Sequence, residues 1–212
     1  MTEEEWLART DLKAMLTFLQ GKASDRKLHL FACACRRGNL YEMRSFAYRV
    51  VTEVMERYAE GLASIEALAA TFDDGDFTPG EDRDAAYFVA EYPSENAFVE
   101  ADCAAKGAHR FGTTPADVRS SQYGLLGDII GSPFAPVAVD PRWLTSTVSN
   151  LAQAAYDERI MPSGELDPAR LAVLSDCLEE SGCDREEILN HLRSAGPHVR
   201  GCWVLDLLLG KS

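Results

Sequence analysis

Helix start signals recur along the 212-residue chain, and they constrain its fold more than any other feature of the sequence. In three places, at Thr114, Asp140 and Asp167, a capping side chain comes directly before a proline. Such a side chain accepts a hydrogen bond from a free backbone amide, and proline suits the first helical position because it has no amide hydrogen to satisfy. These signals predict that helices begin directly after the three capping residues.

Capping boxes, in which an N-cap side chain works together with a glutamate three residues later, add two further start signals. Thr2 with Glu5 and Asp184 with Glu187 fit this spacing. Glycines follow several apolar stretches and indicate helix ends, because glycine readily adopts the left-handed conformation that closes a helix. No stretch shows the alternation of a half-buried strand. The sequence therefore predicts an all-α fold, a compact multi-helix bundle with short connections.

The length favours a single helical domain over residues 1–212. The stretch 131–141, GSPFAPVAVDP, contains prolines that cannot continue a helix, and it indicates an extended connection or an internal seam. The acidic stretch 73–84 has the glycine, proline and aspartate content of a solvated loop. Two helices, at about 83–91 and 94–106, are expected to follow this loop.

The charge of the chain argues against one class of partner. With 21 basic and 34 acidic side chains, the net charge is -13, which repels phosphate backbones and disfavours nucleic-acid binding. The charge is also segregated, because residues 22–49 hold 7 basic and 2 acidic side chains, whereas residues 53–102 hold 2 basic and 14 acidic ones. These regions complement each other within the fold or face partners of opposite charge.

The first ten residues, MTEEEWLART, lack the basic and apolar regions of a signal peptide. No apolar run approaches the roughly 20 residues that a membrane span needs. The expected location is the cytoplasm, where the 6 cysteines stay reduced.

Three blocks of the sequence resemble an uncharacterised family that is expanded in planctomycete bacteria. In chain order they are TDLKAMLTFLQGKASDRKLHLFACACRR, GSPFAPVAVDPRWLTSTVSNLAQAAYDERI and LAVLSDCLEESGCDREEILNHLRSAGPHVRGCWVLDLLLGKS. The resemblance implies a cytoplasmic protein of a paralogous set, and it implies no activity and no catalytic residue. The region from Gly38 to about Tyr123 and the stretch MPSGELDPAR depart from the family pattern.

Cysteines and histidines are the candidate metal ligands. Cys33 and Cys35 are two positions apart, so on a helix their thiols point about 200° away from each other. The chain has neither the C-x-x-C nor the H-x-x-x-H spacing of common zinc sites. We therefore predict no metal and no cofactor, with the cysteines packed as small apolar side chains. The open alternative is a zinc site that joins Cys33 or Cys35 to His198 and Cys202.

A cysteine nucleophile is the second chemical alternative. His29 and Cys33 lie four residues apart on one expected helix, so their side chains can meet. His191 and His198 are further candidate bases for a thiol. The apolar surroundings raise a thiol pKa and make the sulfur unreactive, so we predict no catalytic residue.

The closing stretch GPHVRGCWVLDLLLGKS places a single aspartate, Asp206, in an apolar run. We expect a last helix that begins at Pro197 or His198 and enters the core. An isolated buried carboxylate is very costly, so Asp206 needs a partner. A structural ion pair is predicted between this aspartate and a basic residue. The candidate basic residues are Arg26, Arg36 and Arg200.

Two functions from different classes are open. The favoured one is a non-enzymatic, cytoplasmic protein–protein interaction module that binds a protein partner through its acidic or its basic region. The alternative is a metal-binding protein or a Cys/His-dependent enzyme, with a site formed where the first and last blocks meet. That site would gather His29, Cys33, Cys35, His198, Cys202 and Asp206.

Overall fold

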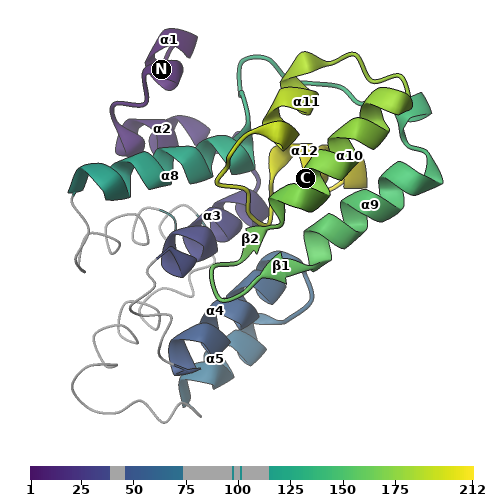
Figure 1. The fold of residues 1–212 in the computed structure, drawn as a ribbon. Helices are drawn as coiled ribbons and strands as arrows, with labels where there is room; N and C mark the ends of the chain where they lie inside the picture. The colour runs from purple at the N-terminus through teal and green to yellow at the C-terminus, as the bar shows by residue number, and fades with distance from the viewer. Residues whose placement is uncertain (39–45, 74–96, 98–100, 102–114) are drawn as a thin grey trace. The chain divides into compact units, whose positions relative to one another are not determined.

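The computed structural model describes residues 1–38, 46–73, 97, 101 and 115–212. These residues contain ten α-helices, one short 3₁₀-helix and one two-stranded antiparallel sheet (Figure 1). The predicted all-α fold is confirmed, and the small sheet was not foreseen. Across this part of the chain, no helix is both long enough and apolar enough to cross a membrane.

The chain divides into two compact units, Met1–Tyr123 and Gly124–Ser212. The boundary falls inside one helix, α8 (Pro115–Ile130). Residues 131–140, where a seam was expected, form a non-helical connection that follows this helix. The single domain and its seam stay predictions.

The N-terminal unit begins with three helices that are capped by side chains at their N-termini. The expected capping box is present at Thr2, Asp11 caps the next helix, and Ser24 caps the third. In chain order the helices are α1 (Glu3–Ala8), α2 (Leu12–Leu19), α3 (Asp25–Arg37), α4 (Phe46–Ala59) and α5 (Ile65–Asp73). The expected loop at 73–84 and the expected helices at 83–91 and 94–106 lie almost wholly outside the described residues.

Helix α3 is the most buried helix of this unit among the described residues. All residues from Leu28 to Arg37 are buried, and α3 packs against α4, which packs against α5. The buried charge of Arg37 is balanced by Glu56 of α4 through two hydrogen bonds, of 2.6 Å from Nε and 3.1 Å from Nη2. Such a two-point contact suits the planar guanidinium and fixes how the helices meet.

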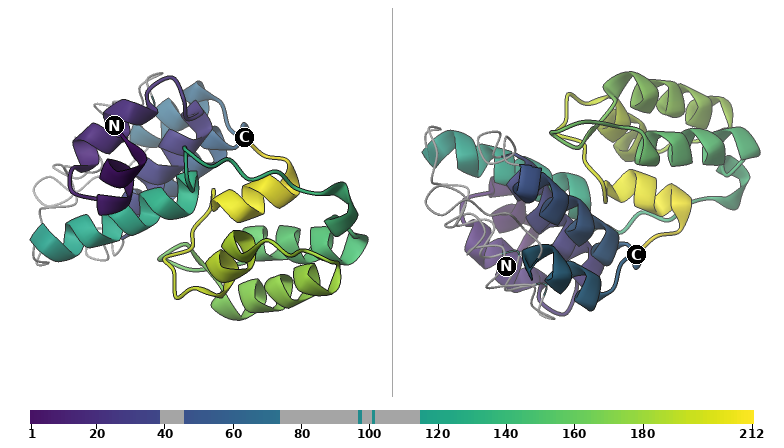
Figure 2. Two further views of the ribbon diagram at one scale, coloured as in Figure 1. Left: turned by 90° about the horizontal axis from the view of Figure 1, so that it is seen from above. Right: turned by 90° about the horizontal axis from the view of Figure 1, so that it is seen from below.

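The C-terminal unit contains the end of α8 and a set of shorter elements. In chain order these are η3 (Pro141–Trp143), α9 (Ser146–Asp157), β1 (Arg159–Ile160), β2 (Glu165–Leu166), α10 (Pro168–Glu180), α11 (Glu186–Arg193) and α12 (Trp203–Leu209). Helix α9 packs against α10 and α12, and α10 packs against α11 (Figure 2). The apolar side chains of these elements form one core cluster, which includes Cys183 and Cys202.

Three start signals in this unit gave different outcomes. Asp167 caps α10 with proline at the first helical position, as predicted. Asp140 instead caps only the 3₁₀-helix, and α9 begins later, with Thr145 as its cap. The predicted capping box of Asp184 and Glu187 is wrong. Arg185 is the N-cap residue of α11, so Asp184 stands one position before the cap.

The expected start of the last helix at Pro197 or His198 is also wrong. Helix α12 begins only at Trp203, and residues 194–202 form an irregular connection between α11 and α12. Strand β2 holds this connection, because Leu166 N–H donates to the carbonyl of His198 at 2.8 Å and Glu165 forms a β-bridge with Val199. The connection carries His198 and ends at Cys202, the N-cap residue of α12.

Candidate metal centre

The first residue of the site, Asp128, lies in the last turn of α8. Nearby Leu126 and Ile129 of the same helix are fully buried, and Asp128 itself is only 3% exposed. A carboxylate at such a position is very costly unless other groups bind it. The helix ends two residues later, where Gly131 has a left-handed φ of +70° and lies against the Trp203 ring.

Gly124, one turn before Asp128, allows the 194–202 connection to approach α8. A Cβ atom at Gly124 would stand 2.9 Å from Cδ and 3.1 Å from Cγ of Pro197. Any larger residue would therefore push away Pro197, which directly precedes His198. The glycine keeps the histidine within reach of Asp128.

The remaining site residues come from α11 and from the connection that follows it. His191 is in the last turn of α11, His198 is in the middle of the connection, and Cys202 is the N-cap residue of α12. His198 and Cys202 are 4% and 0% exposed, and His191 is partly buried. Three separate elements thus bring four potential ligands to one place.

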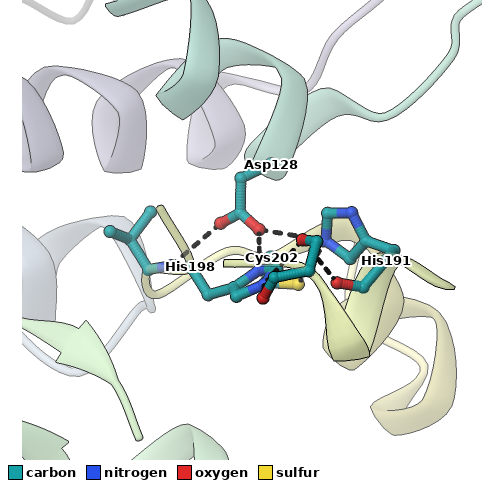
Figure 3. Close-up of polar contacts among 6 residues, drawn as sticks. Asp128, His191, His198 and Cys202 are labelled. Carbon is teal, nitrogen blue, oxygen red and sulfur yellow. Dashed lines mark hydrogen bonds and ion pairs between the residues drawn. The ribbon is translucent and has the colours of Figure 1, made fainter. Parts of the chain in front are cut away.

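The four side chains converge through one atom each, as Figure 3 shows. Oδ1 of Asp128 lies 3.0 Å from Nε2 of His191 and 2.8 Å from Nδ1 of His198. The same Nε2 atom of His191 lies 3.3 Å from Sγ of Cys202. All four potential ligand atoms lie within 4.8 Å of one another.

The atoms that face away from this centre have backbone partners. Oδ2 of Asp128 accepts a hydrogen bond of 2.8 Å from the amide of Val199. Nε2 of His198 lies 3.2 Å from the carbonyl of Ser194 and 3.1 Å from its hydroxyl. Outer hydrogen bonds of this kind orient ligands in metal sites.

The pKa of each of the three most buried groups of the site is shifted from its ordinary value, for different reasons. Burial alone would raise the pKa of Asp128, but hydrogen bonds with His191 and His198 outweigh it and lower that pKa below its ordinary value. Burial opposes the charged form of His198, yet its contact with Asp128 raises the pKa of the ring. Burial raises the pKa of Cys202 well above that of a free thiol, and the Asp128 charge adds to the effect.

The arrangement does not suit a cysteine nucleophile. In a nucleophile–histidine–acid triad, the two partners contact opposite nitrogens of the imidazole, so the ring can pass a proton between them. Here Asp128 and Cys202 both approach the same atom, Nε2 of His191. The thiol is also fully buried with a raised pKa, which opposes formation of the reactive thiolate.

The arrangement does suit a metal ion bound by nitrogen, sulfur and oxygen. In tetrahedral zinc sites the metal–ligand distances of about 2.0–2.3 Å place the ligand atoms about 3.3–3.8 Å apart. The three contacts of 2.8–3.3 Å described above need to lengthen by up to about 0.5 Å to reach that geometry, and a pair at the 4.8 Å limit would have to shorten by about 1 Å. One carboxylate and one thiolate also balance the two charges of Zn²⁺, which leaves the buried centre neutral.

The sequence had named two of these four residues, His198 and Cys202, as members of a possible zinc site. Its other two candidates, Cys33 and Cys35, are buried in α3 of the N-terminal unit and are not members of this cluster. Burial raises the pKa of Cys35 to about 12, so that thiol packs as an apolar side chain.

The ion pair expected for Asp206 stays a prediction. Asp206 is buried in α12, and the guanidinium of Arg200 lies over the Tyr156 ring at 5.5 Å. Arg26 pairs with Glu60 at 2.9 Å, and Arg36 donates to the sulfur of Met55.

Sequence reasoning missed Asp128 entirely and considered His191 only as a base for a thiol. A signal for Asp128 was present, because it stands in the apolar stretch YGLLGDIIG of an expected helix. The argument that singled out Asp206, an aspartate in an apolar run, applies equally to Asp128.

Comparisons with known proteins assign the chain to no group. The sequence matches no protein-family model, and neither a curated protein nor a solved structure is significantly similar to it. The resemblance to a planctomycete family stays a prediction. A functional assignment therefore has to rest on the site.

Proposed function

We propose that the Gly124–Ser212 unit is a zinc-binding helical module whose ion is held by Asp128, His191, His198 and Cys202. The observation that carries the proposal is the convergence of four potential ligand atoms within 4.8 Å, three of them on side chains that are at least nine-tenths buried. Four ligands from the protein complete a tetrahedral shell and leave no position for a substrate, so the role is structural.

The choice of zinc follows from the ligand types. Mg²⁺ and Ca²⁺ prefer shells made only of oxygen, whereas this set has two imidazoles and one thiol. Zn²⁺ accepts nitrogen, sulfur and carboxylate ligands in tetrahedral sites. The ion would tie the end of α8 to α11 and to the residue that begins α12.

The competing explanation is a metal-free hydrogen-bonded network among the same residues. Asp128 would then pair with the two histidine rings, and Cys202 would remain a protonated thiol. The two explanations differ in whether the protein retains a metal ion and in whether the sulfur is needed to retain it.

The deciding experiment measures zinc in the full chain purified without chelator. Native mass spectrometry and elemental analysis should give about one Zn²⁺ per chain. Cys202→Ala should lose the ion, whereas Cys183→Ala, which truncates another buried thiol of the same core cluster, should keep it. Circular dichroism would confirm that both variants are folded.

Two results would overturn the proposal. One is a wild-type chain that takes up no Zn²⁺ even after incubation with the ion. The other is a folded Cys202→Ala variant that holds Zn²⁺ as tightly as wild type. Removal of the ion should lower the melting temperature, because a ligand at 100 times its Kd stabilises the folded state by about 2.7 kcal/mol.

The interaction module favoured by the charge pattern remains a second proposal. Ile160 and Met161, adjacent residues that are 48% and 49% exposed, favour a protein partner for the β1–β2 hairpin. A structural zinc ion and a protein partner are compatible, because the ion would only stabilise the unit that carries this hairpin. Loss of partner binding in Ile160→Ser, with the zinc content unchanged, would support this second role.

A further inference from the structure

Ser194 lies between the two histidines of the metal centre without being a ligand itself. It is the C-cap residue of α11, and its hydroxyl donates to the carbonyl of His191 at 2.8 Å. The same hydroxyl lies 3.1 Å from Nε2 of His198, and the Ser194 carbonyl lies 3.2 Å from that nitrogen. One residue thus contacts the backbone of one histidine and the ring of the other.

The direction of these hydrogen bonds follows from which groups can donate. A carbonyl oxygen only accepts, so the Ser194 hydroxyl gives its single hydrogen to the carbonyl of His191. The hydroxyl oxygen is then left as an acceptor toward His198, and the Ser194 carbonyl is an acceptor as well. Nε2 of His198 therefore has to carry a hydrogen.

The consequence concerns the opposite nitrogen of the same ring. In the absence of metal, Nδ1 donates a hydrogen to Asp128; a metal ion that takes the place of this hydrogen leaves a neutral imidazole with its hydrogen on Nε2 and its lone pair on Nδ1. In this protein Nδ1 is the atom that points into the centre, 2.8 Å from Oδ1 of Asp128. The contacts of Ser194 thus select the nitrogen that faces the other ligands.

We propose that Ser194 is a positioning residue that fixes His198 as an Nδ1 ligand of the metal, while His191 binds through Nε2. This inference rests on the proposed zinc site and adds the ligating atom of each histidine and the residue that sets it. Outer partners of this kind typically contribute 10–100-fold to metal affinity. Ser194→Ala keeps the backbone carbonyl, so we expect a loss at the lower end, about 10-fold.

The chain offers a matched control for this variant. Ser181 is the C-cap residue of α10, and its hydroxyl also donates to a carbonyl of its own helix, that of Cys177, at 2.8 Å. Ser181→Ala removes the same kind of helix-end hydrogen bond on a different helix, ten residues before the nearest ligand, His191. If Ser194 only stabilised the end of its helix, Ser194→Ala and Ser181→Ala would have the same effect on zinc affinity.

The experiment is a competition titration of Zn²⁺ against a chromophoric chelator, with the full-length wild type and three variants. Ser194→Ala should bind zinc about 10-fold more weakly. Ser181→Ala should match wild type, and Ser194→Thr, which keeps a hydroxyl, should recover most of the affinity. In the zinc-loaded wild type, ¹⁵N NMR of the histidine side chains should show His198 with a hydrogen on Nε2 and none on Nδ1.

The failures of the two proposals are distinguishable. If the wild type binds zinc but Ser194→Ala binds it equally tightly, or if Nε2 of His198 is the metal-bound atom, the role of Ser194 is overturned and the zinc site stands. If the wild type binds no zinc in the same titration, the proposed function is overturned, and the positioning role falls with it.

Discussion

Replacing Gly124 with alanine tests the packing of the 194–202 connection against α8. In an ordinary helix interior this change is stabilising by about 1 kcal/mol, because alanine has the higher helix propensity. Here the new Cβ would stand 2.9 Å from Cδ and 3.1 Å from Cγ of Pro197. These atoms belong to a ring fixed to the backbone, so the clash can be relieved only by moving the connection.

The expected size of the effect combines two opposing contributions. Overpacking in a tight interface typically costs about 1–3 kcal/mol, against a propensity gain of about 1 kcal/mol. The net change should be destabilising, by about 1 kcal/mol. The propensity contribution can be measured separately at Ser121, an exposed position of α8, from the difference between Ser121→Gly and Ser121→Ala.

The assay is denaturant unfolding of the zinc-loaded full chain, followed by circular dichroism, together with a zinc competition titration. Gly124→Ala should unfold at lower denaturant concentration than wild type and bind zinc more weakly, because the displaced Pro197 carries His198 away from Asp128. If Gly124→Ala stabilises the protein by as much as glycine-to-alanine does at position 121, the connection does not pack on α8, and the reasoning is refuted.

Two further predictions concern buried groups of the N-terminal unit and a thiol used for comparison. Cys35, whose pKa burial raises to about 12, should resist alkylation by iodoacetamide at pH 8, whereas the partly exposed Cys177 should react. Mass spectrometry of the peptides checks this, and equal labelling of both would contradict it. Glu56→Gln should destabilise the protein by about 3–5 kcal/mol because it leaves the Arg37 charge buried without its carboxylate. The double change Glu56→Leu with Arg37→Met should recover most of that loss in urea unfolding, and a loss under about 1 kcal/mol for Glu56→Gln would contradict the argument.

Helix starts were predictable where the capping residue and the first turn are neighbours in sequence. Thr2 and Asp167 cap their helices as expected, because a cap depends on only four consecutive residues. The expected helix start at Pro197 or His198 failed because another element holds the backbone there. Strand β2 holds the backbone at His198 in an extended arrangement, so a helix cannot begin there.

The site was harder to predict because its ligands follow none of the common zinc-site spacings. His198 and Cys202 are four residues apart, which reads as one face of a helix, but both lie in the connection before α12. Their convergence with His191 depends on how that connection folds back. Common zinc spacings describe compact turns and regular helices, and this irregular segment follows neither.

Asp128 shows what a single sequence can and cannot reveal about such a centre. Its place in an apolar helical run predicts a buried carboxylate that needs partners, and this much was available without a structure. The identity of those partners was not, because His191 lies 63 positions further along the chain and belongs to a different helix. A buried aspartate in an apolar helix therefore indicates that a polar site is present, but it does not identify the other residues of that site. Asp206 has the same sequence signature in α12, so an equally specific partner should exist for it. Asp206→Asn should then destabilise the protein in urea unfolding, whereas no change in the midpoint would show that this carboxylate needs no charged partner.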